Sequence, residues 1–172
     1  MWSNALARWA PVLTARMRIP FISSAAAWAL RPSAARWMRL LRKAEDGTFF
    51  GFRTKAHAYG MTQAPCRVVA VSDDGSIGEK ALVTKPLLAA IEEKRPDLIM
   101  ACGPTPMLAA VQKIANEMGI PCQLSLEERM GCAIGACLGC NVKINLPDGS
   151  WTYKRVCKDG PVFTSEEVAF GG

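Results

Sequence analysis

The sequence contains no hydrophobic run long enough to cross a membrane, and its first 50 residues contain almost no glycine. The longest apolar candidate, Ala25–Leu30, is closed by Arg31 and Pro32, whereas a membrane-spanning helix needs roughly 20 apolar residues. Gly47 is the only glycine among these 50 residues, so they hold no Gly-rich loop of the kind that cradles a pyrophosphate. We therefore expect no transmembrane segment and no complete dinucleotide-binding loop.

Charge and tryptophan are distributed unevenly along the 172 residues. The chain has a formal net charge of +6, and this whole excess belongs to residues 1–48, because the remaining basic and acidic residues cancel. Four of the five tryptophans also lie in residues 1–48, whereas all seven cysteines lie beyond them. Half of the residues are hydrophobic, which excludes a wholly disordered chain. The sequence thus joins two different compositions near position 48.

The basic segment 1–48 permits several interpretations. It could form a nucleic-acid or membrane-surface patch, or a transit-like presequence. Its Ala, Arg, Trp, Pro and Ser bias is equally typical of a shifted reading frame in GC-rich DNA. Two short helices are plausible, around Trp2–Trp9 and Ala34–Lys43. Because the rest of the chain is neutral and shows no nucleic-acid signature, we expect no nucleic-acid partner.

Residues 49–121 have the pattern of a nucleotide-binding α/β domain. Buried strands are predicted over 67–72 and 97–102. A helix is predicted over Lys85–Lys94 with Thr84 as its cap, and another follows Thr105, which can cap it, and ends at Gly119. Strand and helix alternating at this spacing predict a parallel βαβ arrangement.

Ligands of such sheets bind beyond the carboxyl ends of the strands. Two groups of residues are expected there: Cys102, Gly103, Pro104 and Thr105 after one strand, and Asp73 and Asp74 after the other. Gly103 allows a close backbone approach, the following helix start favours an anionic group, and the aspartates could bond a ribose. No first strand or Gly-rich loop is recognisable ahead of them, which weakens the expected site.

The strongest signal is a group of four cysteines. Cys132, Cys137, Cys140 and Cys157 follow the spacing C-x4-C-x2-C-x16-C, which is the ligand set of a plant-type [2Fe–2S] cluster. Small residues separate the first three, so the backbone can wrap closely and aim N–H groups at the sulfurs. After them, strands are predicted over 141–145 and 151–156 around a turn at 147–150, and this hairpin returns Cys157 to the loop. Thr164 or Ser165 resembles a helix start.

Other uses of the cysteines remain open. Structural zinc prefers two C-x2-C-like knuckles, and only Cys137 and Cys140 have that spacing. Disulfides fit poorly, because the number of cysteines is odd. Cys66, Cys102 and Cys122 stand singly in apolar surroundings and are expected in the core, although Cys102 could line a nicotinamide pocket.

Three distinctive stretches lie near the end of the sequence: Leu126–Cys132, the cysteine loop and Lys154–Phe163. Together they resemble the electron-transfer subunit of the NAD-linked, type B dihydroorotate dehydrogenase. The resemblance runs from about Phe49 to Phe170 and is most specific over the last 45 residues. The stretch Ala101–Leu108 is similar to the nicotinamide-side motif of that family, and Gly51–Lys55 and Asp73–Ser76 are similar to its earlier nucleotide-domain motifs.

The resemblance implies a fold and a role. The fold is α/β: a partial, ferredoxin-reductase-like NAD-binding domain with parallel βαβ units over 49–121, then a small [2Fe–2S] cluster domain over 122–172. The implied partner is an FMN-containing dihydroorotate dehydrogenase catalytic subunit in a cytoplasmic heterotetramer that serves pyrimidine biosynthesis. Electrons would pass from it through the cluster, held by the four cysteines named above, to FAD and then to NAD⁺.

The chain departs from the family because the FAD-binding barrel is not recognisable in it. We therefore expect a truncated or frame-shifted member with weak NAD and doubtful FAD binding, and without full oxidoreductase activity of its own; no catalytic residue is assigned. The alternatives are a stand-alone ferredoxin-like electron carrier, a subunit of a related NADPH:ferredoxin or sulfide oxidoreductase, and a zinc-binding structural protein.

Overall fold

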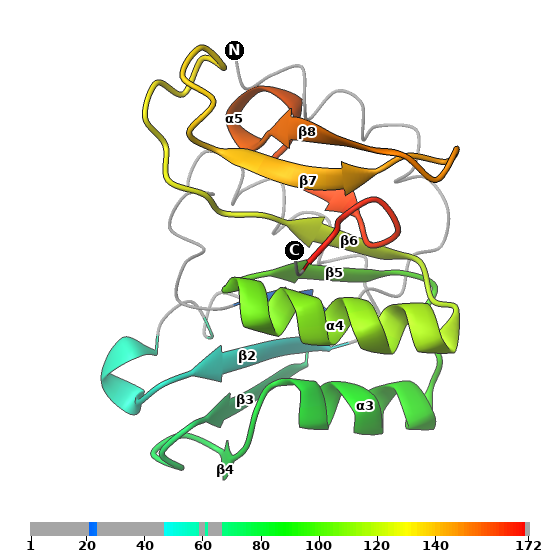
Figure 1. Ribbon diagram of the computed structural model, residues 1–172. Coiled ribbons are helices and arrows are strands. Elements are labelled where there is room, and N and C mark those ends of the chain that lie inside the picture. Colours follow the sequence, from blue (N-terminus) through cyan, green and yellow to red (C-terminus); the bar gives the residue numbers. More distant parts are fainter. Residues whose placement is uncertain (1–20, 24–46, 59–60, 62–66, 171–172) are drawn as a thin grey trace.

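The computed structural model describes residues 21–23, 47–58, 61 and 67–170. In this part of the chain, seven strands form one sheet, and a hairpin and three helices lie beside it (Figure 1). In spatial order the strands of the sheet are β4 (Glu79–Lys80), β3 (Val68–Ser72), β2 (Thr48–Phe52), β1 (Phe21–Ser23), β5 (Ile99–Cys102), β6 (Cys122–Ser125) and β9 (Val162–Thr164). The other elements are the hairpin strands β7 (Asn141–Asn145) and β8 (Trp151–Arg155), the helices α3 (Thr84–Glu93), α4 (Thr105–Met118) and α5 (Val156–Asp159), and the short 3-10 turn η3 (Lys55–His57).

The sheet has the order of a doubly wound nucleotide-binding fold. Every neighbouring pair from β4 to β6 is parallel, and only β9 joins antiparallel, along β6. The chain builds outward from β1 to β2 and β3, and then returns to the other side of β1 to form β5 and β6. Such a reversal creates a crevice at the carboxyl ends of the two central strands. In this sheet the reversal, and therefore the position expected for the crevice, lies between β1 and β5.

The central strand corrects an expectation from the sequence. We expected no first strand of the nucleotide domain within residues 1–48, yet β1 pairs with β2 through Phe21↔Thr48 and with β5 through Phe21↔Met100. A strand of three residues is too short for its periodicity to stand out, and the surrounding Arg- and Ala-rich composition conceals it. The helices expected around Trp2–Trp9 and Ala34–Lys43 lie outside the described residues.

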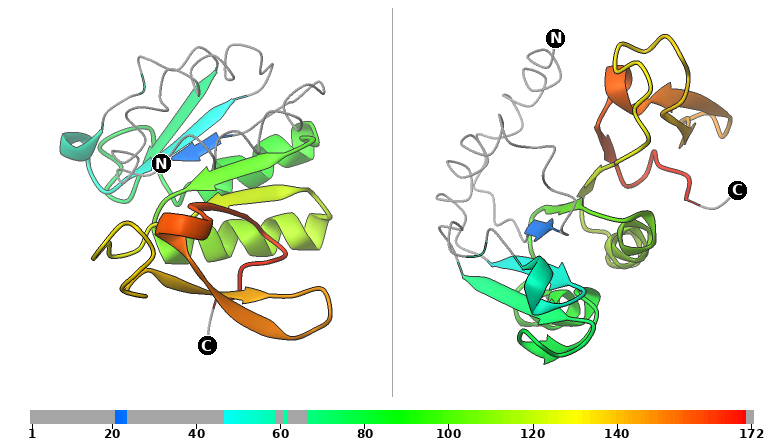
Figure 2. Two further views of the ribbon diagram at one scale, coloured as in Figure 1. Left: turned by 90° about the horizontal axis from the view of Figure 1, so that it is seen from above. Right: turned by 90° about the vertical axis from the view of Figure 1, so that its left-hand side faces the viewer.

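Helices α3 and α4 lie side by side on one face of the sheet (Figures 1 and 2). Both were expected, but their starts differ in detail. Thr84 and Thr105 are the first helical residues rather than caps, and the preceding Val83 and Pro104 make no side-chain capping bond. Gly119 ends α4 as predicted, with a left-handed φ of 60°, a conformation that glycine adopts without steric cost.

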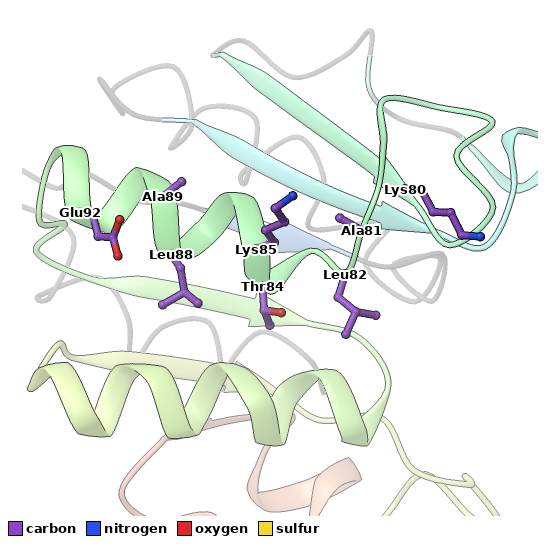
Figure 3. Close-up of a pocket in the computed structure, with 8 residues that line it drawn as sticks. All are labelled: Lys80, Ala81, Leu82, Thr84, Lys85, Leu88, Ala89 and Glu92. Carbon is purple, nitrogen blue, oxygen red and sulfur yellow. The ribbon is translucent and has the colours of Figure 1, made fainter.

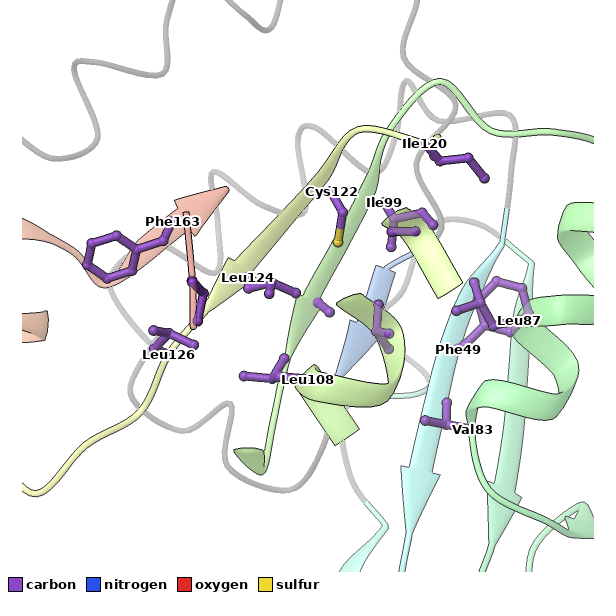
Figure 4. Packing of buried hydrophobic residues seen from close by; sticks show 14 of the residues in the cluster. Phe49, Val83, Leu87, Ile99, Leu108, Ile120, Cys122, Leu124, Leu126 and Phe163 are labelled. Carbon is purple, nitrogen blue, oxygen red and sulfur yellow. The ribbon is translucent and has the colours of Figure 1, made fainter. Parts of the chain in front are cut away.

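One hydrophobic core runs through the whole described fold. It begins with Phe49 on β2 and Leu87 on α3, continues through Leu108 on α4 and Leu124 on β6, and reaches Phe163 on β9 (Figure 4). Leu87 and Leu124 have no exposed surface. The core therefore joins the nucleotide-binding part to the cysteine-rich part, whose hairpin and α5 lie beyond β6 (Figure 2).

The C-terminal segment differs from the expectation in two ways. The sequence division at residue 122 assigns β6 and β9 to the cluster domain, but both are strands of the main sheet. The helix expected at Thr164 or Ser165 is absent, because Thr164 ends β9 and a turn carries the chain to Val168, which forms a bridge to Ile144. In the described residues, no helix is long and apolar enough to cross a membrane.

We predict that Leu87→Ala lowers the free energy of unfolding by about 2–5 kcal/mol, because it leaves a cavity in the core. The matched control is Leu82→Ala: Leu82 is 71% exposed, so its truncation should change stability by less than about 0.5 kcal/mol. Urea unfolding followed by circular dichroism measures both. Equal unfolding midpoints for the two variants would contradict the packing described above.

Candidate metal centre

The first three cysteines of the motif lie on a loop between β6 and β7, next to α5 (Figure 1). Ala133 and Leu138 have positive φ angles of 57°, and Gly135 has one of 83°. Such angles are costly for residues with a Cβ atom, and here they turn successive peptide groups toward the thiols. The small residues between the cysteines, predicted to let the backbone wrap closely, occupy this tightly turned loop.

Backbone N–H groups of the loop point at two of the sulfurs. The Sγ atom of Cys132 accepts from the N–H of Ala136 at 3.2 Å and from that of Cys137 at 3.3 Å, and the Sγ atom of Cys137 accepts from the N–H of Gly139 at 3.4 Å. The N–H of Cys137 is the main reason that the pKa of Cys132 falls to about 6, with further lowering by the N–H of Ile134 and the Cys137 side chain. Hydrogen bonds to sulfur favour the thiolate, which is the form that binds metals.

The other two cysteines form a second pair. Cys140 is buried at the end of the loop, and its Sγ atom accepts from the N–H of Cys157 at 3.5 Å. The N–H of Val156 donates to the Cys140 carbonyl at 3.0 Å. The pKa of Cys157 is raised, chiefly because its thiol interacts with the Cys140 side chain and then because of burial, and the charge of Cys132 adds to this. The hairpin thus returns Cys157 to the loop, as the sequence predicted.

Two pairs of thiols are what a two-iron cluster requires. Among the described residues, no three His, Cys, Asp or Glu side chains converge on a position for a single ion. A [2Fe–2S] cluster makes a different demand, because four thiolates are shared between two irons. Cys132 with Cys137 on one side, and Cys140 with Cys157 on the other, fit this demand, and their N–H donors supply the hydrogen bonds that such sulfurs accept.

The predicted nucleotide residues are divided between two places at the same edge of the sheet. Gly103 is buried at the end of β5, and Pro104 and Thr105 are exposed at the start of α4, beside the crevice between β1 and β5. Asp73 and Asp74 are exposed at the end of β3. Because three strand spacings separate β3 from β5, the two groups are roughly 14 Å apart. They could contact the two ends of one extended ligand but not a single small group.

Asp74 also has a local structural role. One of its carboxylate oxygens accepts from the N–H of Ser76 at 2.9 Å and from its hydroxyl at 2.6 Å, and these bonds lower the pKa of Asp74. The Ser76 hydroxyl in turn accepts from the N–H of Lys55 at 2.7 Å. Ser76 and Asp74 therefore tie the turn after β3 to η3.

The described surface is hollowed in several places, among them one beside α4 and one beside α3. One, of about 210 Å³, has a wall formed by Thr105 of α4, Glu127 after β6, Lys143 of β7 and Phe170 near the C-terminus. The other, of about 540 Å³, is lined by Leu82, Leu88 and neighbouring residues of α3 and the segment before it (Figure 3). The sequence predicted neither hollow, because each depends on which elements pack together.

Cys102 and Cys122 are core residues, as the sequence predicted. Cys102 is 2% exposed and Cys122 is 4% exposed. Burial raises the pKa of Cys102 to about 11, with a further contribution from the charge of Glu127, and burial raises that of Cys122 to about 12. Cys102 nevertheless ends β5, beside the position expected for the crevice, so its contact with a nicotinamide stays a prediction. Cys66 lies outside the described residues.

Comparison with known proteins favours one of the interpretations of the sequence. Residues 127–169 match the iron–sulfur cluster binding domain of dihydroorotate dehydrogenase B. The chain is 45% identical over 120 residues to the electron transfer subunit of dihydroorotate dehydrogenase B (NAD⁺) of Caldanaerobacter subterraneus subsp. tengcongensis, which covers 70% of this chain and 47% of that protein. Over the matched residues, the chain is therefore similar to these electron transfer subunits.

Further relatives agree. The corresponding subunit of Bacillus velezensis is 42% identical over 120 residues, which are 69% of this chain and 41% of the relative. The probable subunit of Methanocaldococcus jannaschii is 38% identical over 128 residues, which are 73% of this chain and 47% of the relative. The chain thus spans less than half the length of each of these curated relatives.

A solved structure agrees with the fold. A chain from the structure of the NADH-dependent reduced ferredoxin–NADP oxidoreductase, described for its insight into flavin-based electron bifurcation, superimposes with a TM-score of 0.69 at 28% identity. The match covers 88% of this chain and 53% of that one. The ferredoxin-reductase-like α/β fold predicted from the sequence is thereby confirmed.

We predict that Cys102 and Cys122 resist alkylation in the folded protein. With pKa values of about 11 and 12, both groups stay protonated at pH 8, and the thiolate is the reactive form. Treatment with iodoacetamide followed by peptide mass spectrometry should leave both unlabelled, and addition of urea should expose both. Native labelling of Cys102 as fast as in urea would contradict its burial.

Proposed function

We propose that this chain is an electron-transfer subunit that holds a [2Fe–2S] cluster on Cys132, Cys137, Cys140 and Cys157. The observation that carries the proposal is the pairing of the four thiols, with backbone N–H groups donating to Cys132, Cys137 and Cys140. When bound, such a cluster supplies single-electron steps between carriers that handle two electrons. The four cysteines supply the ligands, and the loop N–H groups stabilise the negative charge on the sulfurs.

The source of the electrons, in this proposal, is an FMN-containing dihydroorotate dehydrogenase catalytic subunit. The cysteine loop offers an apolar surface on which such a partner could dock, because Met130, Ile134 and Leu138 are 46%, 63% and 58% exposed. Exposed apolar groups clustered at a functional loop are typical of an interaction surface. Docking there would bring the FMN partner next to the thiols and exclude water from the path of the electron.

The acceptors in this proposal are FAD and then NAD⁺, and the names of the relatives include NAD⁺. The crevice beside Gly103, Pro104 and Thr105 is the proposed position for part of the NAD, since the start of α4 favours an anionic group. Cys102 would lie beneath it, and Asp73 and Asp74 would contact the far end. The match to a chain from a structure described for flavin-based electron bifurcation supports the presence of a flavin among the carriers.

The proposal extends to the assembly and its location. A heterotetramer with two catalytic subunits would present two cysteine loops to two FMN groups. A cytoplasmic location is consistent with the chemistry, because free thiols that serve as ligands persist in a reducing compartment. The product of the combined reaction, orotate, would feed pyrimidine biosynthesis.

We predict that anaerobically purified protein is red-brown and bleaches with dithionite, with about two irons and two sulfides per chain. Replacing any one of Cys132, Cys137, Cys140 and Cys157 by Ser should remove most of the iron, whereas Cys122→Ser should keep it. Visible absorption and metal analysis measure the outcome. A colourless protein that contains zinc, even after reconstitution with iron and sulfide, would contradict the proposal and favour a zinc-binding structural protein.

We predict that Ile134→Asp and Leu138→Asp slow the reduction of the chain by the reduced FMN partner at least about tenfold, because each places a charge in an apolar contact. The matched control is Leu82→Asp, on the distant α3 side. Stopped-flow bleaching measures the rate, and dithionite reduction of the same variants shows that the cluster is intact. Equal rates in all three would favour a stand-alone electron carrier that does not dock through this loop.

A further inference from the structure

Two basic side chains flank Cys157 and contact the same point of the cysteine loop. The Nη1 atom of Arg155 donates to the carbonyl of Gly135 at 2.7 Å. Lys158 packs its aliphatic stem against Gly135 so closely that a Cβ atom placed on this glycine would lie 2.9 Å from its Cδ atom. Gly135 is buried and lies between Cys132 and Cys137. The segment that carries Cys157 is therefore attached to the middle of the loop that carries the first pair of thiols.

The orientation of Arg155 is fixed from its other side as well. The carboxylate of Asp159 accepts from the backbone N–H of Arg155 at 2.8 Å and lies 3.5 Å from its Nε atom. Arg155 is also the last residue of β8, where it pairs with Asn141 of β7. A guanidinium presents several donors in a rigid plane, so it can bind Asp159 and Gly135 together. The backbone N–H and the Nε atom of Arg155 thus face Asp159, while its Nη1 atom binds Gly135.

This attachment differs from the one that holds the second pair of thiols. The N–H groups of Val156 and Cys157 bind the carbonyl and the sulfur of Cys140, so they fix Cys157 relative to Cys140. Arg155 and Lys158 instead fix the neighbourhood of Cys157 relative to the loop between Cys132 and Cys137. A two-iron centre needs both relations, because its ligands come from both pairs.

The same two residues bring permanent positive charge to the site. Reduction adds an electron, and therefore one negative charge, to a centre that four thiolates already make anionic. A nearby cation favours the more negative state, while Asp159 offsets part of the Arg155 charge. Lys158 is exposed and Arg155 half-buried, so solvent screens the two charges to different extents.

We propose that Arg155 is a positioning residue of the iron–sulfur centre, which holds the loop at Gly135 over the segment carrying Cys157, and that Arg155 and Lys158 together favour the reduced state. This rests on the ligand set of the proposed function. No step of it involves a proton or a new bond: one electron enters the centre from an external donor, and the two cations stay charged throughout.

Two variants separate position from charge. Arg155→Lys keeps the charge but loses the planar fork that reaches the Gly135 carbonyl, so iron release to a chelator should become about tenfold faster, as for loss of a charge-assisted hydrogen bond, with little change in midpoint potential. Lys158→Met keeps an unbranched stem against Gly135 but loses the charge. It should release iron at the wild-type rate and show a lower midpoint potential.

Arg155→Gln removes both properties and should show both effects. We expect its ratio of reduced to oxidised centre at a fixed potential to fall about tenfold, which is about 59 mV for a one-electron couple. The control is Lys113→Gln on α4, whose side chain is 77% exposed and pairs only loosely with Glu117 at 3.9 Å. It removes the same charge away from the loop and should leave potential and iron release unchanged.

The measurements are a dithionite titration followed by electron paramagnetic resonance and the rate of absorbance loss with a chelator, on the full chain. Wild-type iron release in Arg155→Lys would overturn the positioning role, and wild-type potentials in Lys158→Met and Arg155→Gln would overturn the role of charge. If Arg155→Gln does not fold, the other two variants still decide. Wild-type protein without a centre would overturn this inference and the proposed function together, whereas a normal centre that the FMN partner cannot reduce would overturn only the proposed function.

Discussion

The hydrogen bonds from backbone N–H groups to the cysteine sulfurs are the constraint around which the C-terminal third is built. An N–H group can point at a side chain of its own loop only if the backbone turns sharply, and the positive φ angles of Ala133, Gly135 and Leu138 are the cost of that turn. The fourth thiol comes from a distant position, so a hairpin must return the chain, and β7 and β8 do this. The strain in the loop is offset by the contacts that fix its two ends.

The cysteine-rich part is attached to the nucleotide-binding part by several independent contacts. β9 extends the main sheet along β6. The Nε2 atom of Gln112 on α4 donates to the carbonyls of Ser165 and Val168 at 2.5 and 2.6 Å, and the hydroxyl of Ser165 donates to the Asn116 side chain at 3.1 Å. These bonds connect α4, which begins just after Gly103, to the segment that follows the β7–β8 hairpin. The separation between the two sites is thus set by backbone pairing as well as by side-chain packing.

The cysteine loop and the strands β3 and β5 could be predicted from the sequence. The spacing of the cysteines follows the ligand pattern of a [2Fe–2S] cluster. The loop and the return of Cys157 to it were therefore predicted correctly. The assignment of the four residues as ligands stays a prediction. The apolar runs at 67–72 and 97–102 predicted β3 and β5, because buried parallel strands are continuous in hydrophobicity.

The sequence-based predictions that were wrong concern segments whose structure depends on tertiary contacts. β1 is three residues long and owes its existence to its neighbours on both sides, so no local pattern indicated it. The segment after Thr164 resembles a helix start, yet pairing with β6 and the bridge from Val168 to Ile144 prevail over that local preference. The contacts of Arg155 and Lys158 with Gly135 could not be predicted either. Nothing in the sequence shows that both side chains reach the same glycine, which lies 20 and 23 positions earlier.

The position of β6 has a consequence for modularity. This one strand is paired on one side with β5 of the nucleotide-binding sheet and on the other with β9 of the C-terminal segment, and the core passes through it without a break. Separating β6 from β5 or from β9 would expose the edge of the sheet and one side of the hydrophobic core. The cysteine loop therefore does not form a self-contained module. A segment that kept its packing after transfer to another protein would have to include β5, α4 and β6 as well, so the cysteine-rich part is inherited together with half of the main sheet.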